Sequence, residues 1–167
     1  MALELRPATL DDLDLLKSWD NKPHVIASNP NDPWDWENDL KNNAPWREPF
    51  IAEIDGIPIG FIEILDPHRD IHQYWGEVEP GIRAIDIWIG DEKYLNQGYG
   101  TKMMQLALIR CFNVPEVHSV LVDPLASNLK ARHFYENLGF NYVENRTFGK
   151  DLCAVYKLER TDYGQML

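Results

Sequence analysis

The stretch IWIGDEKYLNQGYGTK, residues 87–102, carries the strongest local signal in the chain and decides its fold. It begins with β-branched and aromatic residues, which favour a strand. It then passes through a polar turn that holds Gly98 and Gly100, and it leads into a helix that we expect from about Thr101 to Phe112. A strand that runs through a turn into a helix is typical of sheets covered by helices.

The turn before this helix is a candidate anion site. The first amides of a helix have no partner inside it and carry partial positive charge, so they suit phosphate. Thr101 adds a hydroxyl donor and Lys102 a charge. Two glycines serve turn geometry alone equally well. The third glycine of a dinucleotide fingerprint and the Gly-Lys-Ser/Thr ending of a P-loop are both missing, so those two classes of site are not predicted.

Working outward, alternating and β-branched stretches predict strands at residues 3–6, 50–54, 57–65, 82–89, 119–122, 140–144 and 152–158. Helices are expected after Thr9, over about 34–40, over 101–112, and after Ser127 or Asn128. Hairpins come first and helical crossovers follow. This order predicts an α/β (α+β) fold with a mixed central sheet of six to seven strands and about four flanking helices. We expect one domain over residues 1–167, since no repeat or long linker interrupts the chain.

Short-range signals mark several boundaries. Thr9 with Asp12 three residues later is a capping-box variant. Asp32-Pro33 is a helix start signal, and Asp55-Gly56 between two apolar runs indicates a tight hairpin. We expect the remainder of segment 21–49, which is rich in Asn, Pro and Asp, to be irregular.

The net charge of −11 restricts the partners. Nucleic acids and anionic membranes are repelled by such a chain, whereas a cationic small molecule is attracted. Acidic proteins are also simply soluble, but residues 63–92 hold eight acidic side chains against only Arg69 and Arg83. No run of about 18 apolar residues could span a bilayer, and no basic stretch precedes an apolar block at the N-terminus. We therefore expect a cytoplasmic protein.

The cysteines and histidines predict no metal site. Cys111 and Cys153 lack metal-ligand spacing, and we expect them to be reduced and buried. His68 and His72 are four residues apart, but we expect both to lie in an exposed loop rather than in a helix, and the other histidines are scattered.

Two segments resemble the GNAT acetyltransferase superfamily. These are Gln97-Gly-Tyr-Gly-Thr101 and Asn128-x-x-Ala131-x-x-Phe134-Tyr135-Glu136-x-x-Gly139-Phe140, the second being the more specific. The predicted order of elements is similar to that fold over nearly the whole chain. The resemblance implies acetyl-coenzyme A as cosubstrate and a sheet that is splayed where it binds. One departure is Leu95, since the superfamily pattern has Gln or Arg three residues before the first glycine.

A narrower resemblance is to the aminoglycoside 6′-N-acetyltransferases. It rests on residues 79–86, 89–101 and 122–128. It implies that Asp86 lies near the amine to be acetylated and that Asp123 contacts a cationic substrate. The Asp-Pro-Gly of many members reads Glu79-Pro80-Gly81 here.

The residues themselves support these roles while leaving alternatives open. Asp86 lies on the face of its strand opposite to Ile85, Ile87 and Ile89. There it could serve as a base, pair with an ammonium group, or form a salt bridge with Arg83. Tyr135 completes an apolar helix stripe with Ala131, Phe134 and Leu138, and the resemblance makes it the general acid for the departing thiolate.

The remaining candidates group by role. Asn128 is a helix cap and, by the resemblance, a ligand of the pantetheine arm. The residues expected to bind the coenzyme are Ile87, Trp88, Ile89, Gln97, Gly98, Tyr99, Gly100, Thr101, Lys102, Asn128 and Tyr135. Those expected to bind the acceptor are Trp34, Tyr74, Trp75, Glu77, Glu79, Asp86 and Asp123, the aromatic ones being equally suited to anchoring loops.

The predicted function is therefore direct acetyl transfer from acetyl-coenzyme A to a cationic small-molecule amine, with the 6′-amine of an aminoglycoside as first choice. Other acceptors are a polyamine, a siderophore hydroxylamine, an amino acid or a protein N-terminus. A different class of function is a non-catalytic sensor of acetyl-coenzyme A. The sequence is compatible with a monomer or a homodimer.

Overall fold

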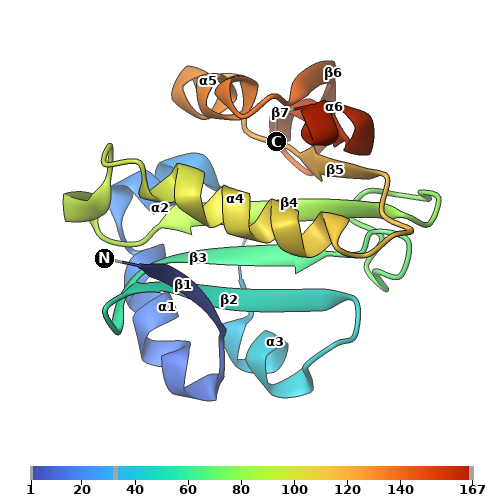
Figure 1. Cartoon of the computed structure of the whole chain (residues 1–167). Coiled ribbons are helices and arrows are strands. Elements are labelled where there is room, and N and C mark those ends of the chain that lie inside the picture. Colours follow the sequence, from blue (N-terminus) through green and yellow to red (C-terminus); the bar gives the residue numbers. More distant parts are fainter. Residues whose placement is uncertain (1, 32–33, 166–167) are drawn as a thin grey trace. The chain divides into compact units, whose positions relative to one another are not determined.

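The computed structural model describes residues 2–31 and 34–165, in which strands and helices follow one another along the chain (Figure 1). The strands are β1 (Leu3–Pro7), β2 (Arg47–Ile54), β3 (Ile57–Leu65), β4 (Ile82–Ile89), β5 (Ser119–Val122), β6 (Asn141–Phe148) and β7 (Asp151–Glu159). The helices are α1 (Leu13–Asp20), α2 (Pro23–Ser28), α3 (Trp36–Asn42), α4 (Tyr99–Phe112), α5 (Leu129–Asn137) and α6 (Arg160–Gln165). Two short 3-10 turns are η1 (Leu10–Asp12) and η2 (Glu92–Tyr94).

The strands form one mixed seven-stranded sheet in the order β1-β2-β3-β4-β5-β7-β6. β4 and β5 are parallel, whereas β1 with β2, β5 with β7, and β6 with β7 are antiparallel. The parallel pair follows from the crossover through α4, because parallel neighbours need a long connection. The predicted mixed α/β sheet is confirmed.

Pairing between β4 and β5 is short. Ile82–Ala84 align with Ser119–Leu121, and β4 then continues to Ile89 beyond this register. The early end of the parallel register is the feature that a splayed sheet requires.

The chain divides into two compact units. The first holds residues 1–64 and 86–107, and the second holds residues 65–85 and 108–167. The break at residue 85 falls inside β4, so this strand contributes residues to both units.

Several boundaries differ from the sequence-based expectation. The described residues contain six α-helices rather than about four, because α2 and α6 were not expected. α2 begins with Pro23 at a first-turn position, where its fixed φ favours a helix. β2 begins at Arg47 rather than Phe50. Pro49 lacks an N–H donor but lies beyond Phe50, the last residue in the register with β1, and its carbonyl oxygen accepts the Ala8 amide at 2.9 Å. α3 begins at Trp36, and its expected start signal Asp32-Pro33 lies outside the described residues.

The predicted local signals are otherwise found. Thr9 and Asp12 form the capping box of η1. Asp55 and Gly56 have φ of 51° and 79°, which are the two left-handed residues of a type I′ hairpin turn. Asn128 caps α5, with its side-chain oxygen accepting the Ala131 amide at 3.1 Å.

Helices cover both faces of the sheet in the first unit. On one face Phe61 of β3 lies at the centre of a buried cluster with Leu16, Trp19 and Trp36 of the helices. A Cβ on the adjacent Gly60 would meet the Met103 side chain of α4 at 3.1 Å. Since neighbouring strand residues point to opposite faces, α4 packs on the face opposite to α1 and α3.

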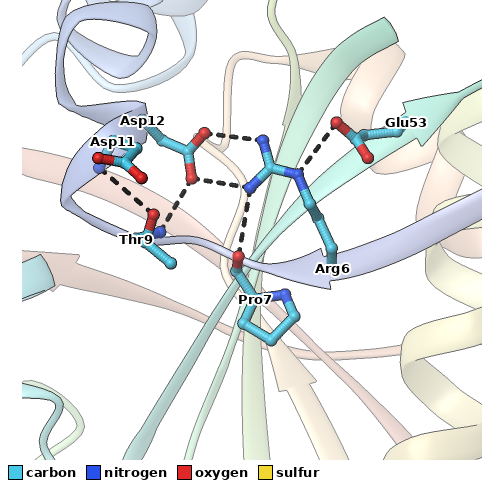
Figure 2. A network of polar contacts seen from close by, with 6 residues as sticks. All are labelled: Arg6, Pro7, Thr9, Asp11, Asp12 and Glu53. Atoms are coloured by element: carbon cyan, nitrogen blue, oxygen red, sulfur yellow. Dashed lines mark hydrogen bonds and ion pairs between the residues drawn. The ribbon is translucent and has the colours of Figure 1, made fainter. Parts of the chain in front are cut away.

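A polar network ties the start of the chain to the sheet (Figure 2). Arg6 of β1 makes two bonds to the Asp12 carboxylate, at 2.7 and 2.9 Å, and an ion pair with Glu53 of β2 at 3.0 Å. The Thr9 amide donates to Asp12 at 2.9 Å. Burial of Asp12 opposes its ionisation, but the bonds from Arg6 and Thr9 outweigh burial and lower its pKa.

This network predicts the effect of Asp12→Asn. The substitution removes the charge that faces Arg6, and we expect the free energy of unfolding to fall by about 2 kcal/mol at pH 7. Because the pKa of folded Asp12 lies below its ordinary 3.8, the stabilisation is complete above that value and is lost as the pH falls through the lower folded pKa. Urea unfolding at several pH values measures this, with exposed Asp11→Asn as control. An equal loss in both variants would contradict the role of the Arg6 pair.

Candidate active site

The peptide groups of successive β4 residues form hydrogen bonds alternately toward the two neighbouring strands, β3 and β5. The Gly90 amide donates to Ile59 of β3 at 2.9 Å, and the Gly81 carbonyl accepts from His118 at the start of β5 at 2.8 Å. Peptide groups of successive strand residues point to opposite sides. Even-numbered residues of β4 therefore bond toward β3, and Ile87 and Ile89 turn their N–H and C=O groups away from it.

His24 of α2 marks this outer edge. Its Nε2 bonds to the Ile89 carbonyl at 2.7 Å, and its Nδ1 lies 3.9 Å from a carboxylate oxygen of Glu92. The Ile89 carbonyl is thus occupied by an imidazole. The peptide groups of Ile87 and the N–H of Ile89 are the groups on this edge that can pair with a strand-like ligand.

The turn into α4 has the geometry expected of an anion site. Gly98 has φ of +83°, a conformation that favours glycine, and a Cβ there would meet nothing within 4 Å. The space in front of this backbone is therefore open. Gln97 donates through Nε2 to the Lys93 carbonyl, which holds the turn against η2. α4 runs for 14 residues from Tyr99, so its first amides carry a full helix dipole.

The side chains around this turn differ in their exposure to solvent. Gln97 and Lys102 are exposed, whereas Tyr99 and Thr101 are half-buried. The Lys102 ammonium lies 5.9 Å from the centre of the Tyr99 ring. Lys102 therefore stays near the helix start, where its charge adds to that of the amides.

Asp86 and Trp88 occupy one face of β4. Asp86 is half-buried, and Trp88 is 6% exposed. The Trp88 ring stacks on Phe61 with centroids 4.6 Å apart, and its Nε1 is buried with no hydrogen-bond partner among the described residues. Arg83 pairs with Asp66 at 3.4 Å, so the structure gives this arginine a carboxylate other than Asp86.

Trp34 joins the same ring cluster. It stacks on Trp36 with centroids 4.7 Å apart and meets Trp88 edge-on at 5.3 Å. It is half-buried, so one part of the ring packs on the cluster and another part faces outward. This position is compatible with both interpretations of the residue, as an anchor and as a wall for a ligand.

In the second unit the loop between β3 and β4 brings Tyr74 to Asp123. The Tyr74 hydroxyl donates to the Asp123 carboxylate at 2.6 Å, and its ring stacks on Phe148 of β6 at 4.6 Å with planes 6° apart. Two of the residues predicted to bind the acceptor, 49 positions apart, thus form one aromatic and acidic surface. Tyr74 is 41% exposed, so a ligand can reach it.

The loop is held by contacts that the sequence did not reveal. Asp70 is 6% exposed and accepts the His72 and Tyr74 amides at 2.8 and 3.2 Å. Trp75 is buried against Phe148, and its carbonyl accepts from Arg146 at 3.1 Å. Asp70 is one of eight acidic residues in segment 63–92, and its sequence position does not distinguish it from the other seven. The buried position of Trp75 is that of a loop anchor.

The other predicted residues of this unit lie apart from that pair. Glu77 and Glu79 are exposed, and Glu79 faces His118 at 3.5 Å. On α5, Asn128 uses its oxygen for the cap, which leaves its amide N–H groups as donors. Tyr135 is 8% exposed and packs edge-on against Phe140. Tyr135 thus fulfils its expected packing role, and a chemical role rests on its hydroxyl.

Two further features, a metal-binding cluster and a membrane-spanning helix, are absent from the described part of the chain. Among residues 2–31 and 34–165, no group of three His, Cys, Asp or Glu side chains could hold a metal ion. No helix in those ranges is long and apolar enough to cross a membrane.

The Tyr74–Asp123 bond predicts a measurable coupling. Tyr74→Phe removes the hydroxyl and leaves the ring stack, and we expect it to lower the free energy of unfolding by about 1 kcal/mol. A double-mutant cycle with Asp123→Asn should show a coupling of similar size in urea unfolding, since each change removes the same bond. Strictly additive effects would show that the bond contributes nothing in solution.

The chain was compared with protein-family models and with proteins of known function. Residues 8–148 match the model of the acetyltransferase (GNAT) domain family. The chain is 31% identical over 153 residues to aminoglycoside N(6′)-acetyltransferase type 1 of Klebsiella pneumoniae, covering 83% of this chain and 74% of that protein. It is 25% identical over 168 residues to lysine N-acyltransferase MbtK of Mycolicibacterium paratuberculosis, covering 93% and 72%.

Solved structures give the same result. Aminoglycoside acetyltransferase AAC(6′)-Ib in complex with coenzyme A and kanamycin superposes with a TM-score of 0.85 at 27% identity, over 98% of both chains. Spermidine N-acetyltransferase from Vibrio cholerae, at 19% identity and a TM-score of 0.78, shares the fold. With its glycine turn, its mixed sheet and a family model matched over most of its length, this chain belongs to the GNAT acetyltransferase family.

Proposed function

We propose that this protein transfers an acetyl group from acetyl-coenzyme A directly to the 6′-amine of an aminoglycoside. The observation that carries the acceptor assignment is the Tyr74–Asp123 pair, which presents an exposed ring beside a carboxylate. Amino sugars carry hydroxylated rings and ammonium groups, and these two side chains can bind both. The 31% identical relative from Klebsiella pneumoniae, which is named for this reaction, supports the choice.

The donor fits the backbone of the first unit. The open turn at Gly98 and the first amides of α4 would bind the pyrophosphate, with Thr101 and Lys102 adding a hydroxyl and a charge. The outward N–H and C=O groups of Ile87 and the N–H of Ile89 would pair with the pantetheine amides. The free amide of Asn128 is a further donor to that arm.

Acetyl-coenzyme A supplies an activated thioester when it is bound. Asp86 would hold the acceptor's ammonium group and take its proton, either directly or through water. The N–H of Trp88 points toward β3, so a donor to the developing oxyanion on this edge would be whichever of the Ile87 and Ile89 N–H groups the pantetheine amides leave unpaired. Tyr135 Oη would give its proton to the departing sulfur. The ammonium nitrogen thus loses two protons, one to Asp86 before attack and one as the amide forms. The second replaces the proton that Tyr135 gives to the sulfur, the first passes from Asp86 to solvent, and no covalent enzyme intermediate is required.

A second candidate acceptor has one observation in its favour. The 25% identical relative from Mycolicibacterium paratuberculosis is named a lysine N-acyltransferase, so its name states acyl transfer to a nitrogen of lysine. An acidic acceptor site would also suit lysine. The amine panel described next separates the two.

Thiol release from acetyl-coenzyme A tests the acceptor. We expect turnover with kanamycin and other aminoglycosides that have a 6′-amine, and at least tenfold lower kcat/KM with matched compounds that carry a 6′-hydroxyl. Lysine and spermidine serve as the competing acceptors. Equal rates with both aminoglycoside sets would contradict the 6′ assignment, and turnover of lysine alone would favour the second candidate.

Tyr135→Phe separates an enzyme from a sensor of acetyl-coenzyme A. Loss of a general acid typically lowers the rate 10²- to 10⁴-fold, so we expect kcat to fall by about 10² while coenzyme A affinity in calorimetry stays within about twofold. The variant keeps the ring that packs on Phe140, and unfolding checks that the fold is retained. A parallel loss of turnover and affinity would point to a packing role instead.

A further inference from the structure

A cavity in the first unit has the chemistry of a cation site. It measures about 420 Å³ and is lined by Asp20, Val25, Ile26, Asn29, Pro30, Asn31 and Trp34. This volume lies within the range of about 300–1,000 Å³ that small-molecule sites occupy. Its wall combines apolar side chains, one carboxylate and one large ring, and no basic side chain is among the lining residues.

Asp20 is held in place from one side. Its Oδ2 accepts the Trp36 indole N–H at 2.6 Å, and Oδ1 has no hydrogen-bond or ionic partner among the residues that the structure describes. Trp36 also stacks on Trp34, with planes 5° apart. One indole therefore positions both the carboxylate and the ring wall. A carboxylate beside an aromatic face is a binding arrangement for an ammonium group.

The position of Asp20 is unfavourable without a ligand. It is the last residue of α1, where the helix dipole is negative and disfavours an acid. Burial raises the pKa of Asp20, and the single bond from Trp36 does not offset it. A local cost of this kind, with no compensating cation in the described chain, is typical of a functional site.

The cavity adjoins the face of β4 that carries Asp86. Its wall Trp34 contacts Trp88 edge-on at 5.3 Å. Trp88 and Asp86 are two residues apart on one strand face, which separates their Cα atoms by about 7 Å. The Trp34 wall of the cavity is thus linked, through the buried Trp88 ring, to the strand face that carries Asp86.

We infer that the Asp20 cavity binds a second ammonium group of a polyamine-type acceptor, with Asp20 as its counter-ion and Trp34 as its wall. This inference rests on the proposed function. It restricts the substrate class, because an acceptor with one amine leaves the cavity unused. Asp20 is distinct from Asp86 and Tyr135, the two residues proposed above to act in the transfer to the reacting amine.

Asp20→Asn tests the inference with two acceptors. Neamine carries several amines, whereas methyl 6-amino-6-deoxyglucoside carries only the reacting one. We expect Asp20→Asn to raise KM for neamine about tenfold at unchanged kcat, since a charge-assisted contact is lost. The values for the glucoside should stay within about twofold. Asp14→Asn, on the exposed side of the same helix, is the matched charge control and should alter neither.

The variant should fold, because asparagine can still accept the Trp36 N–H and the raised pKa shows that the charge itself is unfavourable there. We expect an unchanged or higher urea midpoint. Equal effects on both acceptors, or no effect on neamine, would overturn the inference.

A failure of the proposed reaction can be told apart from a failure of the cavity. If the wild type acetylates neither compound, neamine binding is measured by calorimetry in the presence of coenzyme A, which tests the cavity independently of turnover. About tenfold weaker binding to Asp20→Asn than to wild type and Asp14→Asn would support the cavity alone. Equal binding to all three, or no binding to the wild type, would overturn it.

Discussion

The alternation of peptide groups along β4 is the constraint on which the rest of the site depends. Two hydrogen bonds set its phase, one at Gly90 toward β3 and one at Gly81 toward β5. Once these are made, Ile87 and Ile89 must turn their polar groups outward, and Asp86 and Trp88 must share the face covered by α1 and α3. A shift of β4 by one residue in its register would turn the polar groups of Asp86 and Trp88 outward in place of those of Ile87 and Ile89. The close packing of Gly90 against Trp19 prevents such a shift, since a Cβ there would lie 2.0 Å from the indole.

Charge and aromatic surface are combined in both units. In the second unit Tyr74 lies between Phe148 and Asp123. In the first, Trp36 lies between Trp34 and Asp20. In each arrangement a neutral group donates to the carboxylate, the Tyr74 hydroxyl to Asp123 and the Trp36 indole N–H to Asp20, and such a bond does not neutralise the negative charge. By contrast, Asp12 and Asp66 each face an arginine and serve the fold.

Much of this could be predicted from the sequence because the signals are local. β4 and β5 were predicted to the residue, since β-branched runs with clear stops define both, and the cap at Asn128 and the turn at Asp55-Gly56 follow from short motifs. α2 and α6 are six residues each and carry weak periodicity, so the pattern alone did not reveal them. Asp70 and Asp20 have no sequence signature at all, because their roles arise from burial and from partners distant in the chain.

The ring cluster explains why so irregular a segment can support a site. The described residues of segment 21–35, namely 21–31 and 34–35, include the short helix α2 and are otherwise irregular, and a loop of this kind would be a poor platform by itself. Trp34 and Trp36 anchor it by stacking on each other and by edge-on contacts to Phe61 and Trp88, which belong to adjacent strands. Such contacts contribute about 0.5–1.5 kcal/mol each beyond area burial, and four of them hold the loop to the sheet. The position of Asp20 is thereby tied, through Trp36, to the strand that carries Asp86.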